Sequence, residues 1–260
     1  MPVQAVLFDL DDTLIVDEAI SREAFAETAR LAAALCGADS QAFIGDSMAA
    51  AKKRWISCPA IAYCKRIGIS AYEGLWGNFA GDIEPLRQLQ EWTPGFRTAV
   101  FEAALRAQEI EPNGAEEELA VAWATARKKL SRLMPDAREV VTRLAERYKL
   151  GLLTNGAPAF QRQKFAAFGL ESRFQAVAVS GERDIGKPDP GIFHWLLGEL
   201  AVKASEAVMV GNSLERDIAG ARNAGICSVW IRVPGAEESV DVTPDFEILS
   251  LAELPAVLDV

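Results

Sequence analysis

The chain has 260 residues, half of them hydrophobic and a quarter charged, which is the balance of an ordinary globular protein. Its net charge of −10 and its lack of a long basic run argue against a nucleic-acid polymer as a partner, because affinity for phosphate backbones depends on clustered Lys and Arg. With no signal-peptide pattern, and no apolar run of the roughly 18 residues that span a bilayer, we expect a cytoplasmic protein with no membrane partner.

The first predicted element is a short buried strand over residues 5–8. Three acids follow it within four positions, and ligands of an open parallel sheet bind just outside the carboxyl ends of its strands. Asp9 and Asp11 are two residues apart, so in an extended chain their carboxylates face the same way and repel each other. A hard cation such as Mg²⁺ would compensate for this repulsion. The alternative interpretation is a strand followed by an acidic, solvated turn.

Residues 17–134 read almost wholly as helix. No alternating β-branched segment interrupts them, and Gly and Pro supply the breaks, one of them at Thr93-Pro94-Gly95. We interpret this block as a helical insert. The predicted helices cover residues 18–36, 40–55, 83–91, 95–108 and 115–132.

From residue 135 onward, predicted strands and helices alternate, which indicates a parallel sheet covered by helices on both faces. The first strand belongs to the same sheet. The sequence therefore predicts an α/β fold: a doubly wound parallel-sheet (Rossmann-like) core of residues 1–16 and 135–260, with an inserted α-helical cap of residues 17–134. The predicted strands are 150–153, 174–179, 207–210 and 227–231, and the predicted helices are 136–148, 158–168, 190–200 and 215–224.

Three further strand ends carry polar groups. Thr154, Asn155 and Gly156 end one strand and suit an anion at the next helix start, although Thr and Asn are also routine helix caps. Lys187 precedes a proline-marked helix start and could neutralise phosphate, although most lysines are simply exposed. A fourth group, Gly211 to Asp217, follows a strand with a glycine turn and oxygen-bearing side chains. Its alternative role is a capped turn at a helix start.

The order and spacing of these segments resemble the haloacid dehalogenase superfamily over essentially the whole chain. Asp9-Leu10-Asp11-Asp12-Thr13 is similar to its first motif, Thr154 to its second, Lys187 to its third, and Gly211 to Asp217 to its fourth. The helical insert is similar to the family's helical cap. The resemblance implies a Mg²⁺-dependent phosphomonoester hydrolase that acts on a small phosphorylated metabolite.

The resemblance also implies a role for each residue. Asp9 would attack phosphorus to form an aspartyl-phosphate, and Asp11 would protonate the leaving oxygen and then deprotonate water. Thr154 would bind the phosphoryl group together with Asn155 and Gly156, and Lys187 would balance its charge. The implied metal ligands are a carboxylate oxygen of Asp9, the backbone carbonyl of Asp11, and Asn212 or Asp217 of the fourth motif.

One departure from the family pattern leaves alternatives open. The fourth motif commonly begins Gly-Asp, whereas this chain has Gly211-Asn212, and an amide oxygen supplies no negative charge to a metal. A metal-independent 2-haloacid dehalogenase is therefore one alternative, although such enzymes typically lack the second acid, Asp11. A phosphomutase and a catalytically decayed binding module are two more. The sequence leaves monomer and homodimer both open.

The cysteines and the single histidine suggest no further site. The four cysteines form no CxxC pair, so we expect free thiols rather than zinc. His194 falls inside a predicted helix without a GxSxG elbow, so we expect a partly exposed helix residue rather than a catalyst.

Overall fold

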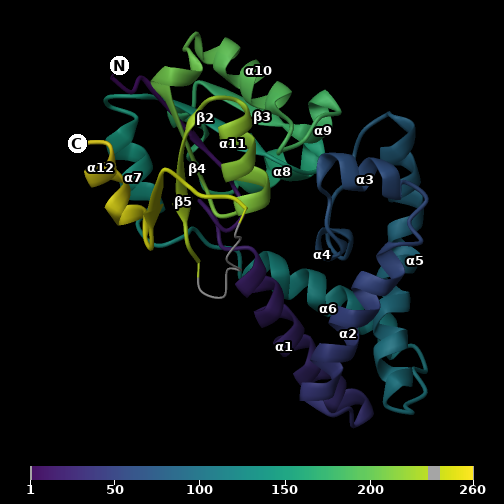
Figure 1. Cartoon of the computed structure of the whole chain (residues 1–260). Helices are drawn as coiled ribbons and strands as arrows, with labels where there is room; N and C mark the ends of the chain where they lie inside the picture. Colours follow the sequence, from purple (N-terminus) through teal and green to yellow (C-terminus); the bar gives the residue numbers. More distant parts are fainter. Residues whose placement is uncertain (1, 234–240, 260) are drawn as a thin grey trace. The chain divides into compact units, whose positions relative to one another are not determined.

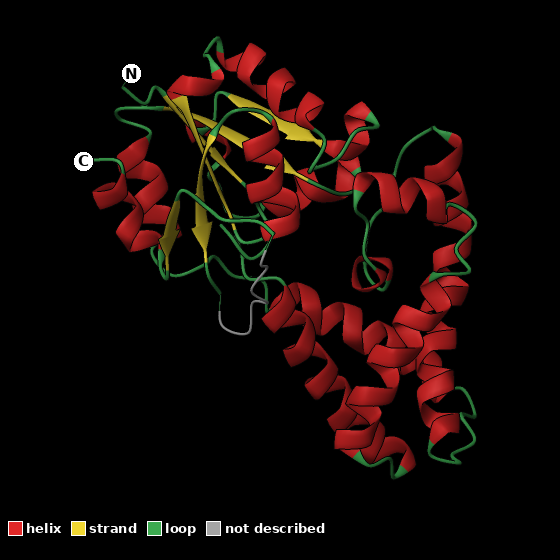
Figure 2. Ribbon diagram, in the orientation of Figure 1, coloured by secondary structure: helices red, strands yellow, loops and turns green. Residues whose placement is uncertain are grey.

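The structure is a computed structural model, and it describes residues 2–233 and 241–259. The chain divides into two compact units (Figure 1). The first unit comprises Met1–Val16, Arg66–Gly68 and Arg132–Val260, and the second comprises Asp17–Lys65 and Ile69–Ser131. All described strands belong to the first unit, while the second is built from helices and their connections (Figure 2).

The first unit is built on a six-stranded parallel sheet in the order β3-β2-β1-β4-β5-β6. This is the strand order of a doubly wound sheet, which confirms the predicted α/β fold. The strands are β1 (Ala5–Phe8), β2 (Lys149–Thr154), β3 (Ala176–Val179), β4 (Ala207–Gly211), β5 (Cys227–Ile231) and β6 (Phe246–Ile248). Strand β6 was not predicted, because it has three residues and two of them are exposed.

Strand β1 lies between β2 and β4, and all four of its residues are buried. Val6 and Phe8 pack into the apolar cluster on one face, with side chains from α7 (Ala137–Leu144), α8 (Pro158–Ala166) and α12 (Leu254–Val257). Ala5 and Leu7 pack into the cluster on the other face, with α10 (Pro190–Leu200) and α11 (Ala219–Asn223). Because alternate residues of a strand face opposite sides, a continuous apolar run is what a strand covered on both faces requires.

Short helical segments complete the first unit. The one that follows β4 differs from the sequence prediction: a π-helical turn, Leu214–Ile218, precedes α11 where a regular helix over 215–224 was expected. The others are Glu171–Arg173, α9 (Ser180–Arg183), Ala204–Glu206 and Leu251–Glu253. None of the helices in residues 2–233 and 241–259 combines the length and the apolar character that crossing a bilayer requires.

The second unit packs helix against helix around aromatic side chains. Phe25 lies 5.0 Å from Trp123 between ring centroids, and Phe43 stacks on Phe101 at 6.2 Å. Arg127 is buried there, ion-paired with Asp17. The helices are α1 (Glu18–Cys36), α2 (Ser40–Trp55), α4 (Ala71–Gly74), α5 (Glu84–Ala107) and α6 (Ala115–Lys129), together with α3 (Ile61–Ile67) up to Lys65.

The predicted break at Thr93-Pro94-Gly95 is wrong, because α5 runs through it as one helix. A proline inside a helix removes one N–H donor and crowds the preceding turn. Here the residues before and after Pro94, among them Leu89 and Phe96, are buried on the same helix. Thr93 also donates its hydroxyl to the Leu89 carbonyl at 2.8 Å within that turn. Packing therefore outweighs the local preference for a break.

Candidate active site

The ends of the central strands bring the predicted residues together. The strand register places Phe8 of β1 beside Leu152 of β2 and Val210 of β4. Asp9 follows directly, and its N–H donates to the Val210 carbonyl at 3.0 Å. Thr154 is the last residue of β2. These side chains therefore leave the sheet at its carboxyl edge, where doubly wound folds bind ligands.

Lys187 joins the first motif to the fourth. Its Nζ lies 2.5 Å from Oδ1 of Asp9 and 2.7 Å from Oδ1 of Asp217, and all three residues are buried. Asn155 fixes the Lys187 backbone: its Oδ1 accepts from the Lys187 N–H at 2.9 Å, and its Nδ2 donates to the Lys187 carbonyl at 3.0 Å. The Asn155 side-chain amide is thus engaged with the Lys187 backbone, and the phosphate contact expected of Asn155 stays a prediction.

This cluster holds two carboxylates and one ammonium, so with all three ionised its charge is −1. The pKa of Asp9 is raised to about 6, mainly because the carboxyl is buried. The Lys187 ammonium lowers this pKa, and the Asp217 carboxylate raises it further. Burial lowers the pKa of Lys187, but the carboxylates of Asp217 and Asp9 outweigh it, so the pKa is raised overall. The site therefore has excess negative charge beside Asp9, which a cation would relieve.

Thr13 and Asn212 bring further oxygen atoms to Asp9. The buried Thr13 hydroxyl donates to Oδ2 of Asp9 at 3.1 Å and lies 3.5 Å from Oδ1 of Asn212. The Asn212 backbone is fixed in turn, because its carbonyl accepts from Nε1 of Trp230 at 2.9 Å. Within the described residues, no group of three or more His, Cys, Asp or Glu side chains is arranged to hold a metal ion. A metal here would therefore use a mixed set of carboxylate, amide and backbone oxygens.

The turn after β4 is shaped around Asp217. The Ser213 N–H donates to Oδ2 of Asp217 at 2.9 Å, so both carboxylate oxygens of Asp217 have partners. A Cβ at Gly211 would lie 2.3 Å from Cγ of Asp217. Gly211 is therefore required because the Asp217 side chain packs directly against its Cα. Any larger residue would displace the carboxylate that contacts Lys187.

Asp11 is held by two side chains of α8 that we did not predict as site residues. Nζ of Lys164 lies 2.5 Å from Oδ1 of Asp11, and Nε2 of Gln161 lies 3.0 Å from Oδ2. Gln161 also donates to Oγ1 of Thr154 at 3.1 Å. Their positions in the sequence could have indicated burial, because Gln161 and Lys164 share the buried face of α8 with Phe160 and Phe165.

The turn after β2 is closed by Ser180, which the sequence analysis also missed. The Gly156 N–H donates to Oγ of Ser180 at 2.9 Å, and Ser180 donates to the Ile67 carbonyl at 2.6 Å. Gly156 has φ of +145°, and a Cβ there would lie 2.6 Å from Nε2 of Gln161. The Gly156 N–H is thus engaged with Ser180, and Gly156 is needed both for its backbone conformation and for the approach of Gln161.

Two other features lie apart from these contacts. His194 is exposed on α10, as expected, and its Nε2 lies 3.2 Å from the Ala224 carbonyl.

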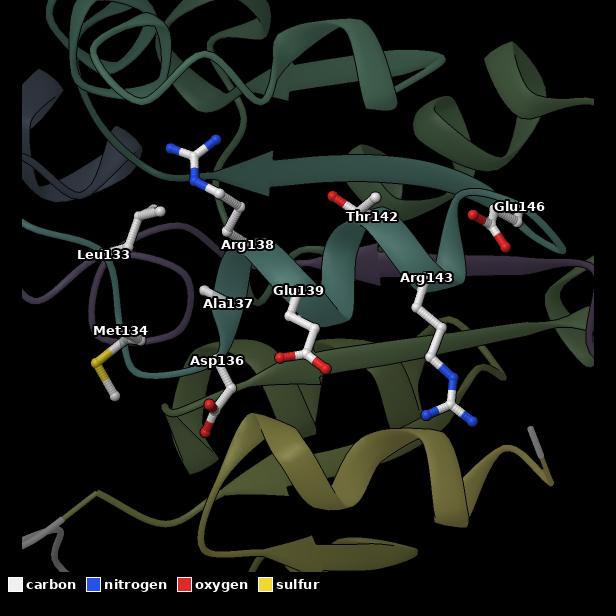
Figure 3. A pocket seen from close by; sticks show the side chains of 9 residues that line it. All are labelled: Leu133, Met134, Asp136, Ala137, Arg138, Glu139, Thr142, Arg143 and Glu146. Carbon is white, nitrogen blue, oxygen red and sulfur yellow. The ribbon is translucent and has the colours of Figure 1, made fainter.

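A hollow of about 600 Å³ runs along α7, lined by charged side chains of both signs (Figure 3). Its lining includes none of the candidate residues described above. The lining residues are Leu133, Met134, Asp136, Ala137, Arg138, Glu139, Thr142, Arg143 and Glu146.

Comparisons with known proteins identify the family of the chain. The chain is 35% identical to a phosphoserine phosphatase of Thermus thermophilus, over 97% of this chain and 98% of that protein. It is 31% identical to the human N-acylneuraminate-9-phosphatase, over 98% and 94% of the two chains. In fold it is similar to the magnesium-bound hydrolase YfnB of Bacillus subtilis, with a TM-score of 0.63, 21% identity and full coverage of both chains. A family model for haloacid dehalogenase-like hydrolases matches residues 3–225, and the chain belongs to that family of hydrolases.

Proposed function

We propose that this hydrolase is a Mg²⁺-dependent phosphatase that cleaves a small phosphorylated metabolite through an aspartyl-phosphate on Asp9. The observation that carries the proposal is the buried contact of Lys187 with both Asp9 and Asp217. A fixed ammonium beside a carboxylate suits a reaction in which negative charge gathers around a transferring phosphoryl group. Two relatives that match almost the whole chain carry the names of phosphatases, which supports the same reaction class.

The contacts around the strand ends support a role for each residue. Asp9 attacks phosphorus while Thr13 and Lys187 hold its two oxygens in place. Asp11 first donates a proton to the leaving oxygen and then accepts one from the water that cleaves the aspartyl-phosphate. Thr154 accepts a hydrogen bond from Gln161, which leaves its own hydroxyl hydrogen for the phosphoryl group.

The residues present fit a magnesium ion. Oδ2 of Asp9 and Oδ1 of Asn212 both lie within reach of the Thr13 hydroxyl, so two hard oxygens face the same region, and the excess negative charge of the cluster favours a cation. We propose Asp9, Asn212 and the backbone carbonyl of Asp11 as ligands. Asp217, whose two oxygens contact Lys187 and Ser213, acts through these neighbours. When bound, the ion would neutralise charge on the phosphoryl oxygens.

The dehalogenase alternative is less well supported. Displacement of a halide requires no acid to protonate the leaving group, yet this chain has a second acid, Asp11, with a donor on each of its oxygens. A phosphomutase would use the same aspartyl-phosphate and differ only in the group that accepts it. We further propose that the helical residues 17–134 act as the cap domain that sets substrate choice, a role implied by the family resemblance.

The test is hydrolysis of p-nitrophenyl phosphate with and without Mg²⁺, run beside a 2-chloropropionate assay. Mg²⁺-dependent phosphate release is expected. Metal-independent release of chloride would indicate a dehalogenase instead. The proposal would be contradicted if the protein were inactive in both assays and also hydrolysed neither phosphoserine nor N-acylneuraminate 9-phosphate. In the active protein, Asp9→Asn should abolish turnover and preserve the fold, whereas the exposed Asp136→Asn serves as the matched control.

A further inference from the structure

We propose that Gln161 and Lys164 are positioning residues that hold the proton-transferring carboxylate of Asp11 in register with Thr154. The proposal rests on the proposed function, because it assigns Asp11 its proton-transfer role. Gln161 and Lys164 are three residues apart on α8, so they lie on the same side of the helix. Both are buried, while the Asp11 side chain keeps 26% of its surface exposed.

Gln161 links the acid to the phosphate-binding strand end. Its Nε2 has three acceptors within reach: Oδ2 of Asp11 at 3.0 Å, Oγ1 of Thr154 at 3.1 Å and the carbonyl oxygen of Asn155. A carboxylate and a carbonyl can only accept, so the nitrogen rather than the oxygen of the amide faces them. One amide group thereby fixes the separation between Asp11 and Thr154.

Lys164 holds the other oxygen of the same carboxylate. Its side chain is 4% exposed, and its Nζ lies 2.5 Å from Oδ1 of Asp11 and 5.3 Å from the centroid of the Phe160 ring. With Gln161 on Oδ2, the two donors fix both the position and the rotation of the carboxylate. Proton transfer needs this, since the donor must lie within hydrogen-bond reach of both the leaving oxygen and the attacking water.

A purely structural role explains this arrangement poorly. Replacing a buried ion pair by apolar side chains is often neutral or stabilising, so stability alone gives no reason to place an ammonium on the apolar face of α8. The partner is also not an arbitrary acid, because Asp11 lies two residues from Asp9 at the end of β1. Since Asp11 is partly exposed, Lys164→Met leaves it in contact with water, and we expect this variant to fold.

The experiment compares Lys164→Met and Gln161→Leu with the wild type by rapid mixing with p-nitrophenyl phosphate and Mg²⁺. Nitrophenolate leaves without a proton, so the first step should be nearly unaffected, whereas hydrolysis of the aspartyl-phosphate needs Asp11 as a base. We expect a burst of about one nitrophenolate per enzyme, followed by steady-state turnover that is at least about tenfold slower than that of the wild type. The upper bound is the loss of the 10²- to 10⁴-fold that general acid–base catalysis contributes. Asp11→Asn is the positive control. Lys149→Met is the matched negative control, because Lys149 begins β2, at the opposite end of the strand from Thr154, and its Nζ donates to the Leu200 carbonyl at 2.7 Å.

Crystal structures of the same two variants provide a readout that requires neither metal nor substrate. A displaced or rotated Asp11 carboxylate, together with the burst, is the expected result. An unmoved Asp11 carboxylate, or both kinetic phases reduced in proportion without a burst, would overturn the positioning role. If the wild type itself releases no nitrophenolate, the proposed function fails instead, and the crystal structures alone decide whether Gln161 and Lys164 hold Asp11.

Discussion

Replacing Asp9 by asparagine should stabilise the metal-free protein at neutral pH, although the same change is expected to abolish turnover. Asparagine has nearly the shape of aspartate but carries no charge. Asp9 has a pKa of about 6 in the folded protein, against 3.8 as its ordinary value, because burial and the Asp217 carboxylate disfavour its charge more than Lys187 favours it. Above that pKa the folded chain must carry an unfavourable charge that the unfolded chain carries freely.

The size of the effect follows from the two pKa values. A separation of about two pH units corresponds to about 3 kcal/mol at 1.4 kcal/mol per unit. Because the pKa of Asp9 is raised on folding, its carboxyl imposes no penalty on the folded state below pH 3.8, its ordinary pKa. The penalty grows as the pH rises and is complete above the folded pKa of about 6. The penalty should therefore be about 3 kcal/mol at pH 7.5 and about 1 kcal/mol at pH 4.5. Lys187, whose pKa is raised, stays charged throughout this range and adds no slope.

The assay is urea unfolding of both proteins in EDTA at pH 4.5 and pH 7.5, followed by circular dichroism. Asp9→Asn should be more stable than the wild type at both values, and the gap in unfolding free energy should widen by about 2 kcal/mol at the higher pH. The exposed Asp136→Asn is the control and should show no such widening. A gap that is constant with pH, or a variant less stable than the wild type at pH 7.5, would refute the electrostatic argument.

Three further predictions concern the same cluster. Asn212→Asp should tighten Mg²⁺ binding by adding a full charge beside the ion, as measured by isothermal titration calorimetry, and an unchanged dissociation constant would remove Asn212 from the metal site. Gly211→Ala should lower the unfolding free energy by about 1–3 kcal/mol and reduce turnover, because its Cβ would overlap Asp217; a variant with wild-type stability and kcat would contradict this. Lys187→Met should lower the free energy of unfolding by about 3–5 kcal/mol at pH 7.5, because it leaves Asp9 and Asp217 buried without a counter-charge. Urea titrations should show that this loss becomes smaller toward pH 4.5. A loss that stays the same would argue against charge repulsion as its cause.

Local patterns were sufficient for much of the fold. A buried parallel strand is a short apolar run ended by polar residues, so β1, β2, β4 and β5 could be recognised from their own sequences. Strand β6 could not, because Phe246 and Glu247 are exposed at the sheet edge and resemble a loop. Pro94 misled the prediction because the packing that keeps α5 continuous joins residues beside the proline to side chains distant in sequence, such as Phe96 to Trp55 at 5.4 Å between ring centroids.

Some residues of the candidate site could also be predicted from local sequence, and others could not. Residues at strand ends, such as Asp9 and Thr154, were identified because topology places the carboxyl ends of parallel strands at one edge of the sheet. Gln161 and Lys164 were missed because their partner Asp11 is about 150 residues away in sequence and only the folded chain joins them. The spacing along α8 places Gln161 and Lys164 on the face of Phe160 and Phe165, but it does not show which distant residue a buried polar side chain contacts.

The three residues 66–68 have a practical consequence for engineering. Their neighbours in sequence on both sides belong to the second unit, but residues 66–68 belong to the first unit, where the Ile67 carbonyl accepts the hydrogen of Ser180 and so completes the turn at Gly156. A chimaera that imports a relative's whole helical segment, residues 17–131, would exchange this acceptor as well. Grafts that retain Arg66–Gly68 from the host should keep the turn at Gly156 intact, which makes two shorter transplants, 17–65 and 69–131, the better design.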